Sequence, residues 1–242
     1  MDKVVPDDHL LDQLTTLTSA LRIALPGQGG PVRLQPQMAH QVALKVMEEV
    51  MGFYITLTSS AVGGTGVVAV TSRKSLDSIA VVRRGQLVGL YPGAIYLPVQ
   101  PIFFQSIGNP FIFRCADGII IDGFNKRVSK LLFKSCVNRD RVGFFLIADT
   151  SWLTPFPLNP LNVGQYVNNQ SKSHPSNVAY QELTVEAHHI PLQERQLIPN
   201  LWYSPPEGIP VSDLPLRLVA LVATRDIGSG EELFSDYFTI IQ

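Results

Sequence analysis

The hydrophobic period of this chain changes near residue 53. Beyond that point, short runs rich in Val, Ile, Phe and Tyr alternate with Gly, Pro, Asn and Asp, which is typical of short strands joined by tight turns. The expected strands cover residues 53–57, 67–70, 79–82, 87–90, 119–121, 142–148, 178–181, 218–223 and 238–241. This pattern favours a β-rich domain built from small, irregular sheets.

Before residue 53 the apolar residues follow a helical period. An amphipathic helix is expected over residues 7–25, where leucines recur every three or four positions, and a second over residues 37–51, with Gly52 as its stop. The chain is therefore divided into a helical segment, 1–52, and a β-rich domain, 53–242, with a mixed insertion at about 97–165. The predicted fold class is β-rich α+β.

Composition limits the possible partners. The chain has 242 residues, of which 45% are hydrophobic and 16% charged, so it can bury a sizeable core. A net charge of -1 provides no global attraction to nucleic acid or to an anionic membrane. The apolar runs are too short to span a bilayer, and residues 1–25 are unlike a signal peptide. We expect an intracellular protein, in nucleus or cytoplasm, without a membrane partner or dedicated nucleic-acid binding.

The cysteine and histidine pattern argues against a metal site. Cys115 and Cys136 are expected to be free thiols, with one disulfide as the alternative. There is no C-x-x-C pair or Cys/His cluster, which argues against structural zinc, and no metal is expected. His174, His188 and His189 are interpreted as surface residues.

Three segments have the residue types of a ligand site. The first is the glycine-rich run 63–69, which is followed by residues 87–93 and by itself is explained equally well by a tight hairpin. The second is the asparagine-rich stretch 164–169 and its continuation 175–180, where turn formation is an equally good interpretation. The third is residues 219–237, in which a strand leads into an Asp/Gly turn, two acids and a tyrosine.

Taken together and in this order, the three segments resemble the SET-domain family. The last of them, Arg-Asp-Ile-x-x-Gly-Glu-Glu-Leu-x-x-Asp-Tyr at 225–237, is similar to the closing motif of the family nearly position for position. The resemblance covers about 53–237. It implies a β-clip-like fold of small curved sheets, in which the C-terminal segment threads under a preceding loop as a pseudoknot, preceded here by the helical segment.

The resemblance also implies an activity and its residues. SET-domain proteins transfer a methyl group from S-adenosyl-L-methionine to a lysine ε-amine of a protein or peptide substrate. By similarity, Tyr237, Tyr91 and Tyr180 would be the catalytic residues, and Tyr237 would also contact the methyl donor. The other residues implied in cofactor binding are Gly64, Thr65, Gly66, Asn168 and Asn169. Glu231 and Glu232 are expected to be turn and surface acids.

This chain departs from the family pattern in two places. Asn168-Asn169-Gln170 stands where the family usually has Asn-His-Ser, and no cysteine-rich tail follows Tyr237. The N-terminal helices, the insertion or a partner would then have to close the cofactor site.

The alternative hypothesis is a SET-fold interaction module without turnover. Such a module could bind a partner through its channel or through the basic residues of the insertion. These are Lys126, Arg127, Lys130, Lys134, Arg139 and Arg141. A solvated face is the simpler interpretation of those charges.

Overall fold

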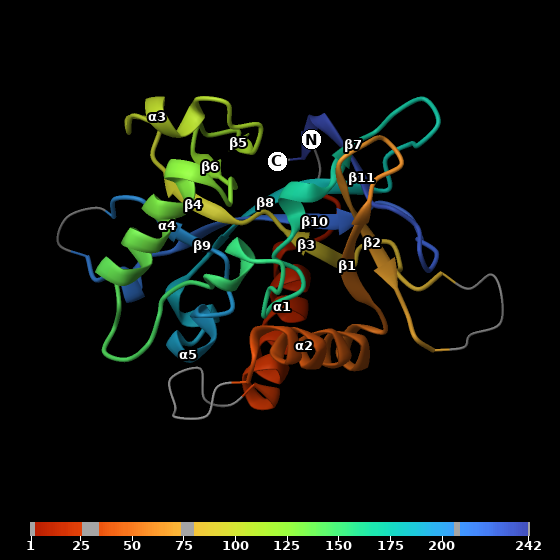
Figure 1. Cartoon of the computed structure of the whole chain (residues 1–242), viewed down its shortest axis with the longest axis horizontal. Helices are drawn as coiled ribbons and strands as arrows, with labels where there is room; N and C mark the ends of the chain where they lie inside the picture. Colours follow the sequence, from red (N-terminus) through yellow and green to blue (C-terminus); the bar gives the residue numbers. More distant parts are fainter. Residues whose placement is uncertain (1–2, 26–33, 74–79, 206–208, 242) are drawn as a thin grey trace.

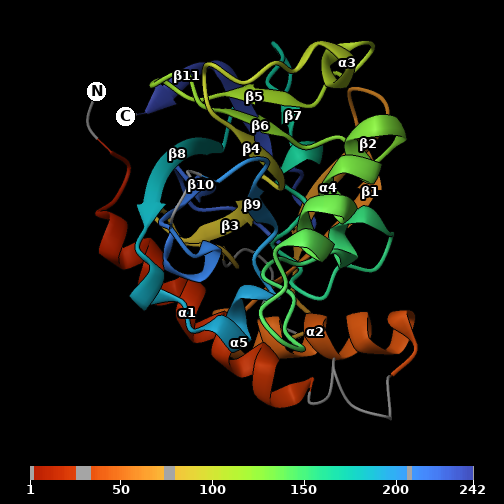
Figure 2. The ribbon, with the colours of Figure 1, turned by 90° about the vertical axis from the view of Figure 1, so that its left-hand side faces the viewer.

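The computed structural model describes residues 3–25, 34–73, 80–205 and 209–241, without the side chains of residues 237–241. Two helices, α1 (Asp7–Ala24) and α2 (Pro36–Met51), lie together at one end of the molecule, below the sheets in Figures 1 and 2. None of the described helices is both long and apolar enough to cross a bilayer.

Three small sheets make up the rest of the framework. The strands β1 (Tyr54–Ser59) and β2 (Thr65–Val70) form an antiparallel hairpin. A five-stranded sheet has the order β3-β10-β8-β11-β7, and its strands are β3 (Leu87–Leu90), β7 (Asn168–Asn169), β8 (Val178–Val185), β10 (Leu216–Ala223) and β11 (Phe234–Ile241). A four-stranded sheet has the order β5-β6-β4-β9, and its strands are β4 (Gly93–Tyr96), β5 (Ile112–Arg114), β6 (Ile120–Asp122) and β9 (Asn200–Trp202). The β-rich α+β class is confirmed.

Short helices occupy the long connections. They are α3 (Phe103–Ser106), α4 (Arg127–Arg139) and α5 (Leu192–Arg195), with 3-10 turns η1 (Ser151–Leu153), η2 (Gly164–Tyr166), η3 (Ala187–His189) and η4 (Val211–Asp213). Within the insertion, α3 and α4 lie beside β5 and β6, on the side of the molecule opposite the β1–β2 hairpin (Figure 1).

Both N-terminal helices form where the leucine and valine spacing predicts them. The leucine stripe of α1 is buried in the same hydrophobic cluster as the five-stranded sheet, and Gly52 ends α2 with φ of 87°. A polar contact adds to this packing, because the fully buried Gln181 of β8 donates to the Val5 carbonyl and to Asp7. The helices thus share a core with the sheets, and a domain boundary at residue 52 remains a prediction.

The last described strand, β11, is inserted between β7 and β8 and runs parallel to both. Phe234 pairs with Asn168 and Ser235 with Val178, so residues far apart in sequence meet at one point of the sheet. These pairings bring the asparagine-rich segment beside the closing motif. The threading of the chain beneath a loop stays a prediction.

Two of the predicted strands differ from the structure. The strand expected at 142–148 is wrong: Val142 and Phe145 form a tight turn around Gly143, whose φ is 60°. Of the strand expected at 79–82, residue 79 lies outside the described part of the chain, and Val82 forms only an isolated bridge to Ile227.

The helix α4 was not expected from the sequence. Its buried positions, Ser129, Phe133, Cys136 and Val137, have helical spacing and pack in a second hydrophobic cluster with Tyr96. In the sequence, the basic residues between these positions obscured the period.

Gly164 permits a close approach between the asparagine-rich segment and the five-stranded sheet. A Cβ at this position would lie 2.6 Å from the Leu90 carbonyl oxygen and 2.6 Å from Leu221 Cδ1. We expect Gly164→Ala to lower the free energy of unfolding by about 1–3 kcal/mol, as overpacking of a buried site does. Urea unfolding would measure this. Gly228→Ala is the matched control, because its Cβ would meet only Glu231 Oε2 at 3.8 Å. Equal stability of the two variants would contradict the prediction.

Candidate active site

A cavity of about 820 Å³ opens where the β1–β2 turn, β5, β8 and the asparagine-rich segment meet. Five of the residues singled out in the sequence line it: Gly64, Thr65, Tyr91, Asn168 and Tyr180. The insertion supplies a further part of the wall, through residues 110–115 and Asn125 and Lys126. The structure therefore brings most of the predicted site residues to one place, and the insertion helps to close it.

Three aromatic rings are packed together in the wall of this cavity. The ring centroids of Tyr91 and Tyr180 are 6.2 Å apart in a T-shaped arrangement, and Phe113 of β5 lies 5.1 Å from each of them. Tyr91 and Tyr180 are almost fully buried. The Ser235 hydroxyl lies 3.4 Å from the Tyr180 hydroxyl, so the closing motif reaches this cluster. The result is an apolar wall with phenol oxygens, a surface suited to an alkyl chain that ends in a polar group.

The glycine-rich turn between β1 and β2 presents backbone to the same cavity. Gly63 and Gly64 have φ of 105° and 74°, the left-handed region that favours glycine, and a Cβ at either position would meet nothing within 4 Å. Open space therefore adjoins this backbone. A ligand can approach it without meeting a side chain.

Gly66 has a different role in the structure. Its Cβ would lie 2.3 Å from Glu232 Oε1, and Gly66 does not line the cavity. The absence of a side chain admits Glu232, which accepts hydrogen bonds from Ser60 Oγ at 2.5 Å and from the Ala61 N–H at 2.9 Å. Glu232 therefore ties the closing motif to the β1–β2 turn.

The two asparagines of β7 are placed differently. Asn168 lines the cavity, and its side-chain amide donates to the Thr65 carbonyl at 2.9 Å and weakly to Glu232 at 3.5 Å. Asn169 is half-buried, pairs with Ser235 and does not line the cavity. Tyr237 lies in β11, two residues beyond Ser235, and its side chain is outside the described part of the structure.

Glu231 is a turn acid, as expected, but it is more than a surface group. Its carboxylate accepts hydrogen bonds from the Gly228 N–H at 2.9 Å, from Asn177 at 3.0 Å and from Arg225 at 2.5 Å. Burial opposes ionisation, but these donors outweigh it and hold the pKa of Glu231 below its usual value. The two acids of the motif thus organise the closing segment, and neither lines the cavity.

Sequence reasoning missed several of the lining residues. Tyr166 lines the cavity and accepts a hydrogen bond from Asn125 at 2.8 Å; burial raises the pKa of its hydroxyl. Tyr166 lies inside the stretch 164–169 that drew attention for its asparagines, so its aromatic ring was a usable signal. Phe113 and Asn125 belong to the insertion, where no spacing pointed to the site.

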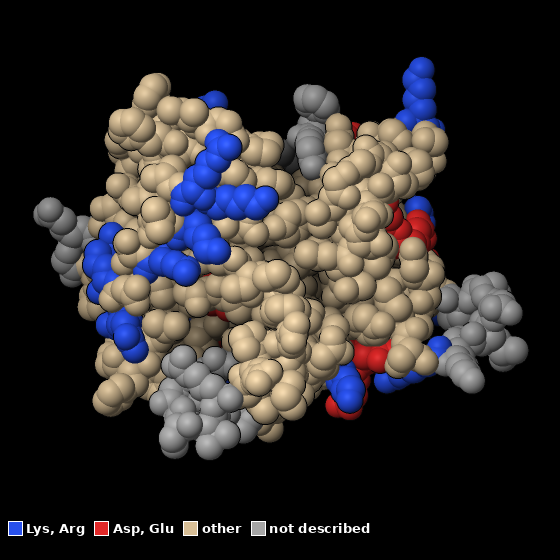
Figure 3. All heavy atoms as spheres, in the orientation of Figure 1, with Lys and Arg blue, Asp and Glu red and all other residues tan. Residues whose placement is uncertain are grey.

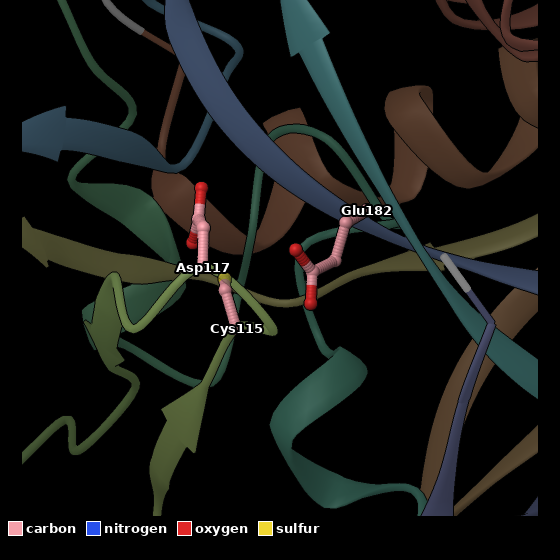
Figure 4. Close-up of side chains that lie close together, drawn as sticks. All are labelled: Cys115, Asp117 and Glu182. Atoms are coloured by element: carbon pink, nitrogen blue, oxygen red, sulfur yellow. The ribbon is translucent and has the colours of Figure 1, made fainter.

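A cluster of possible metal ligands lies at the edge of the cavity (Figure 4). The ligand atoms of Cys115, Asp117 and Glu182 are all within 4.8 Å of one another. Arg217 forms ion pairs with both carboxylates, and burial together with Glu182 raises the pKa of the Cys115 thiol to about 12. A neutral thiol and two carboxylates already paired with a guanidinium make a poor cation site. We assign no metal to this cluster.

Comparison with known proteins identifies the family. The chain is 44% identical over 219 residues to proteins named SET domain-containing protein 9 from Pongo abelii and Homo sapiens. The match covers 90% of this chain, 77% of the Pongo abelii protein and 70% of the Homo sapiens protein. The chain belongs to the SET-domain family.

Two other comparisons add little. No family model matches the chain. A solved structure of CpSET8 from Cryptosporidium aligns with 93% of this chain and 78% of its own length. Its identity is 14% and its TM-score 0.36, which is too distant to support an argument.

Glu231 links the stability of this segment to pH. Because its pKa is lower in the folded chain than in the unfolded one, its contribution is fully present above the unfolded pKa and is lost as pH falls through the folded pKa. We expect Glu231→Gln to destabilise the protein at pH 7 and to flatten the fall in melting temperature below about pH 4.5. Thermal melts from pH 7 to 3 would measure this. If the melting temperature of Glu231→Gln fell with pH as steeply as that of the wild type, the prediction would be contradicted.

Proposed function

We propose that this chain is an S-adenosyl-L-methionine-dependent protein-lysine methyltransferase, with Tyr237, Tyr91 and Tyr180 at the reaction centre. One observation carries the proposal. The glycine-rich turn, Asn168 and the aromatic cluster come from separate parts of the chain, and they meet at a single cavity of about 820 Å³. Membership of the SET-domain family supports the same activity.

The residues around the cavity fit a methyl donor. Its volume lies in the range of about 300–1,000 Å³ found for small-molecule sites. Gly63, Gly64 and Thr65 offer backbone beside open space, and Asn168 offers an amide for a polar end of the ligand. When bound, S-adenosyl-L-methionine supplies an electrophilic methyl group on a sulfonium. Tyrosine faces nearby would favour that positive charge.

The aromatic wall prepares the lysine. An ammonium has no lone pair, so the amine must lose its proton before it attacks. A channel walled by Tyr91, Phe113 and Tyr180 disfavours the charged form and lowers the pKa of the lysine. The same walls align the amine, and good alignment of two reactants can contribute about 7–11 kcal/mol. The hydroxyls of Tyr180 and Ser235 are placed to accept or donate hydrogen bonds at the end of such a channel.

Tyr237 is the sharpest test of the assignment. We expect Tyr237→Phe to reduce methyl transfer at least about 100-fold, because one hydroxyl that acts in the transition state is removed. The fold and donor binding should be retained, since the substitution leaves no large cavity. Transfer of radiolabelled methyl to peptide measures the rate, and calorimetry measures donor binding.

The matched control is Tyr203→Phe, whose ring stacks on Tyr96 and does not line the cavity. A wild-type rate in Tyr237→Phe would overturn the role of Tyr237. Absence of donor binding to the unmodified chain at millimolar concentration would favour the interaction module instead.

The contact between Ser235 and Tyr180 bears on the product. Ser235 stands where many SET domains have an aromatic residue that limits the number of methyl groups, and Tyr180 lies beside it. We expect the phenol to hold a water in the space that a second methyl would occupy. Expelling it costs about 1–3 kcal/mol, which slows the second transfer tenfold or more. The wild type should therefore produce mainly monomethyl-lysine, and Tyr180→Phe should shift the product toward dimethyl-lysine. Mass spectrometry of the peptide decides this, and trimethyl product from the wild type would contradict it.

A further inference from the structure

A row of cations follows one face of α4. Lys130 and Lys134 are spaced four residues apart, which places them on the same side of the helix. Lys126 has extended backbone just before the helix begins, and Arg141 follows just beyond its end. Figure 3 shows Lys and Arg side chains gathered on the left of the view, where α4 lies in Figure 1, with almost no acidic surface between them. From Lys130 to Lys134 the helix rises about 6 Å.

This row joins two cavities. Lys126 lines the candidate active site, while Lys134 and Arg141 line a second cavity of about 790 Å³. The second cavity also has an apolar part, which includes Phe144, 89% exposed at the tip of its turn, and Phe156. A ligand that lies along α4 would therefore meet Lys and Arg side chains and, at the far end, apolar surface; the buried Asp149 is the one acid among the residues that line the second cavity.

The cations of this row have no carboxylate partner within the described part of the chain, although the Lys130 ammonium donates a hydrogen bond to the Leu153 carbonyl at 3.1 Å. Arg139, Arg217 and Arg225 each form an ion pair with a carboxylate there. No such pair is found for Lys126 or Lys134 among the described residues. The same holds for Arg127 and Arg141. Neighbouring cations without counter-charges repel one another, so binding of an anionic partner would lower the electrostatic energy of this surface.

Two features at the N-terminus of α4 are unfavourable for stability: its basic residues and the backbone conformation of Arg127. Lys126 and Arg127 lie at the helix N-terminus, where the helix dipole disfavours positive charge, and the first turn contains no acid. Arg127 also has φ of 51°, the only left-handed value for a residue other than glycine among the described residues. A merely solvated face would not require this arrangement. Strain of this kind is typical of functional sites.

We propose that the substrate is a polypeptide with acidic residues on one side of the target lysine, and that this acidic flank lies along α4 from the active site to the second cavity. The inference rests on the proposed lysine methyltransferase activity. An extended chain advances about 3.3 Å per residue, so the 6 Å between Lys130 and Lys134 corresponds to about two residues. Acidic positions about two residues apart, followed by an apolar side chain near Phe144, would fit the surface best. A flank rich in Lys or Arg would be repelled.

A polypeptide fits this surface better than a nucleic acid does. The surface begins at the channel proposed for a lysine side chain and ends in a cavity with apolar walls, so peptide side chains suit both ends.

Peptide binding in the absence of methyl donor tests the proposal. Fluorescence anisotropy would compare peptides of about 20 residues, each with one central lysine in a Gly/Ser background, whose flank carries Asp and Glu, their amides, or Lys and Arg. We expect the acidic peptide to bind about tenfold more tightly than the amide peptide at low salt, and the advantage to shrink as salt is added. The basic peptide should bind most weakly.

Charge-reversal variants locate the binding surface. Lys134→Glu with Arg141→Glu should remove the preference for the acidic flank, and the neutral pair Lys134→Gln with Arg141→Gln should reduce it partly. Lys172→Glu is the matched control, because this exposed lysine lines neither cavity. Melting temperatures would verify that every variant is folded.

Three outcomes would overturn the proposal: no preference among the flanks, an equal effect of Lys172→Glu, or tighter binding of a single-stranded oligonucleotide that depends on Lys134. Because binding is measured without donor, it is separate from turnover. Acidic-flank binding with no transfer to any peptide would sink the methyltransferase assignment alone, whereas transfer without flank preference would sink only this inference.

Discussion

The side chain of Asn177 holds the last strand in the centre of the structure. Its Oδ1 accepts a hydrogen bond from the Phe234 N–H at 2.9 Å, and its Nδ2 donates to the Glu232 carbonyl at 2.9 Å and to the Glu231 carboxylate at 3.0 Å. The backbone N–H of Asn177 donates to Phe234 as well. Asn177 is almost fully buried, so loss of this amide would leave several buried groups unpaired. The placement of β11, and with it the meeting of Ser235 and Tyr180, depends on this residue.

Around that anchor, the closing motif connects the separate walls of the cavity. Glu232 reaches the β1–β2 turn, Glu231 holds its own turn through Gly228, and Ser235 reaches the aromatic cluster. The contacts of Glu232 and Ser235 are hydrogen bonds between segments far apart in sequence, whereas the contact of Glu231 with Gly228 is local. The cavity walls come from separate small sheets, and these polar links fix one wall relative to the others. The shape of the site is therefore set by the motif as much as by the residues that line it.

Local spacing predicted the helices well and the strands in part. The leucine spacing predicted the C-terminal end of α1 to within one residue, and residues 87–90 form β3 as predicted. In both segments the apolar residues that set the pattern are the ones that are buried. The failure at 142–148 has a physical reason: its apolar residues surround Gly143, which turns the chain instead of extending it. The burial pattern of α4 was present in the sequence but was masked by intervening cations.

The candidate site was recovered through motifs and not through periodicity. Gly64, Thr65, Tyr91, Asn168 and Tyr180 line one cavity, whereas Gly66 instead makes room for Glu232. Phe113 and Asn125 were out of reach, because only tertiary contacts bring the insertion to this wall.

The position of β11 in the sheet has a consequence for how the chain assembles. Its neighbours β7 and β8 come earlier in the sequence, and so does β10, which pairs with the other edge of β8. Pairing of β11 with strands so distant in sequence is expected to be slow, because the intervening chain loses conformational entropy before the new contacts compensate for it. Until then, the edge of β8 that will face β11 is open to pairing with other chains. Before β11 is in place, the chain would therefore expose a strand edge that can pair with other chains, beside the cavity of the folded protein. We expect this protein to need protection by chaperones most during the last step of its folding.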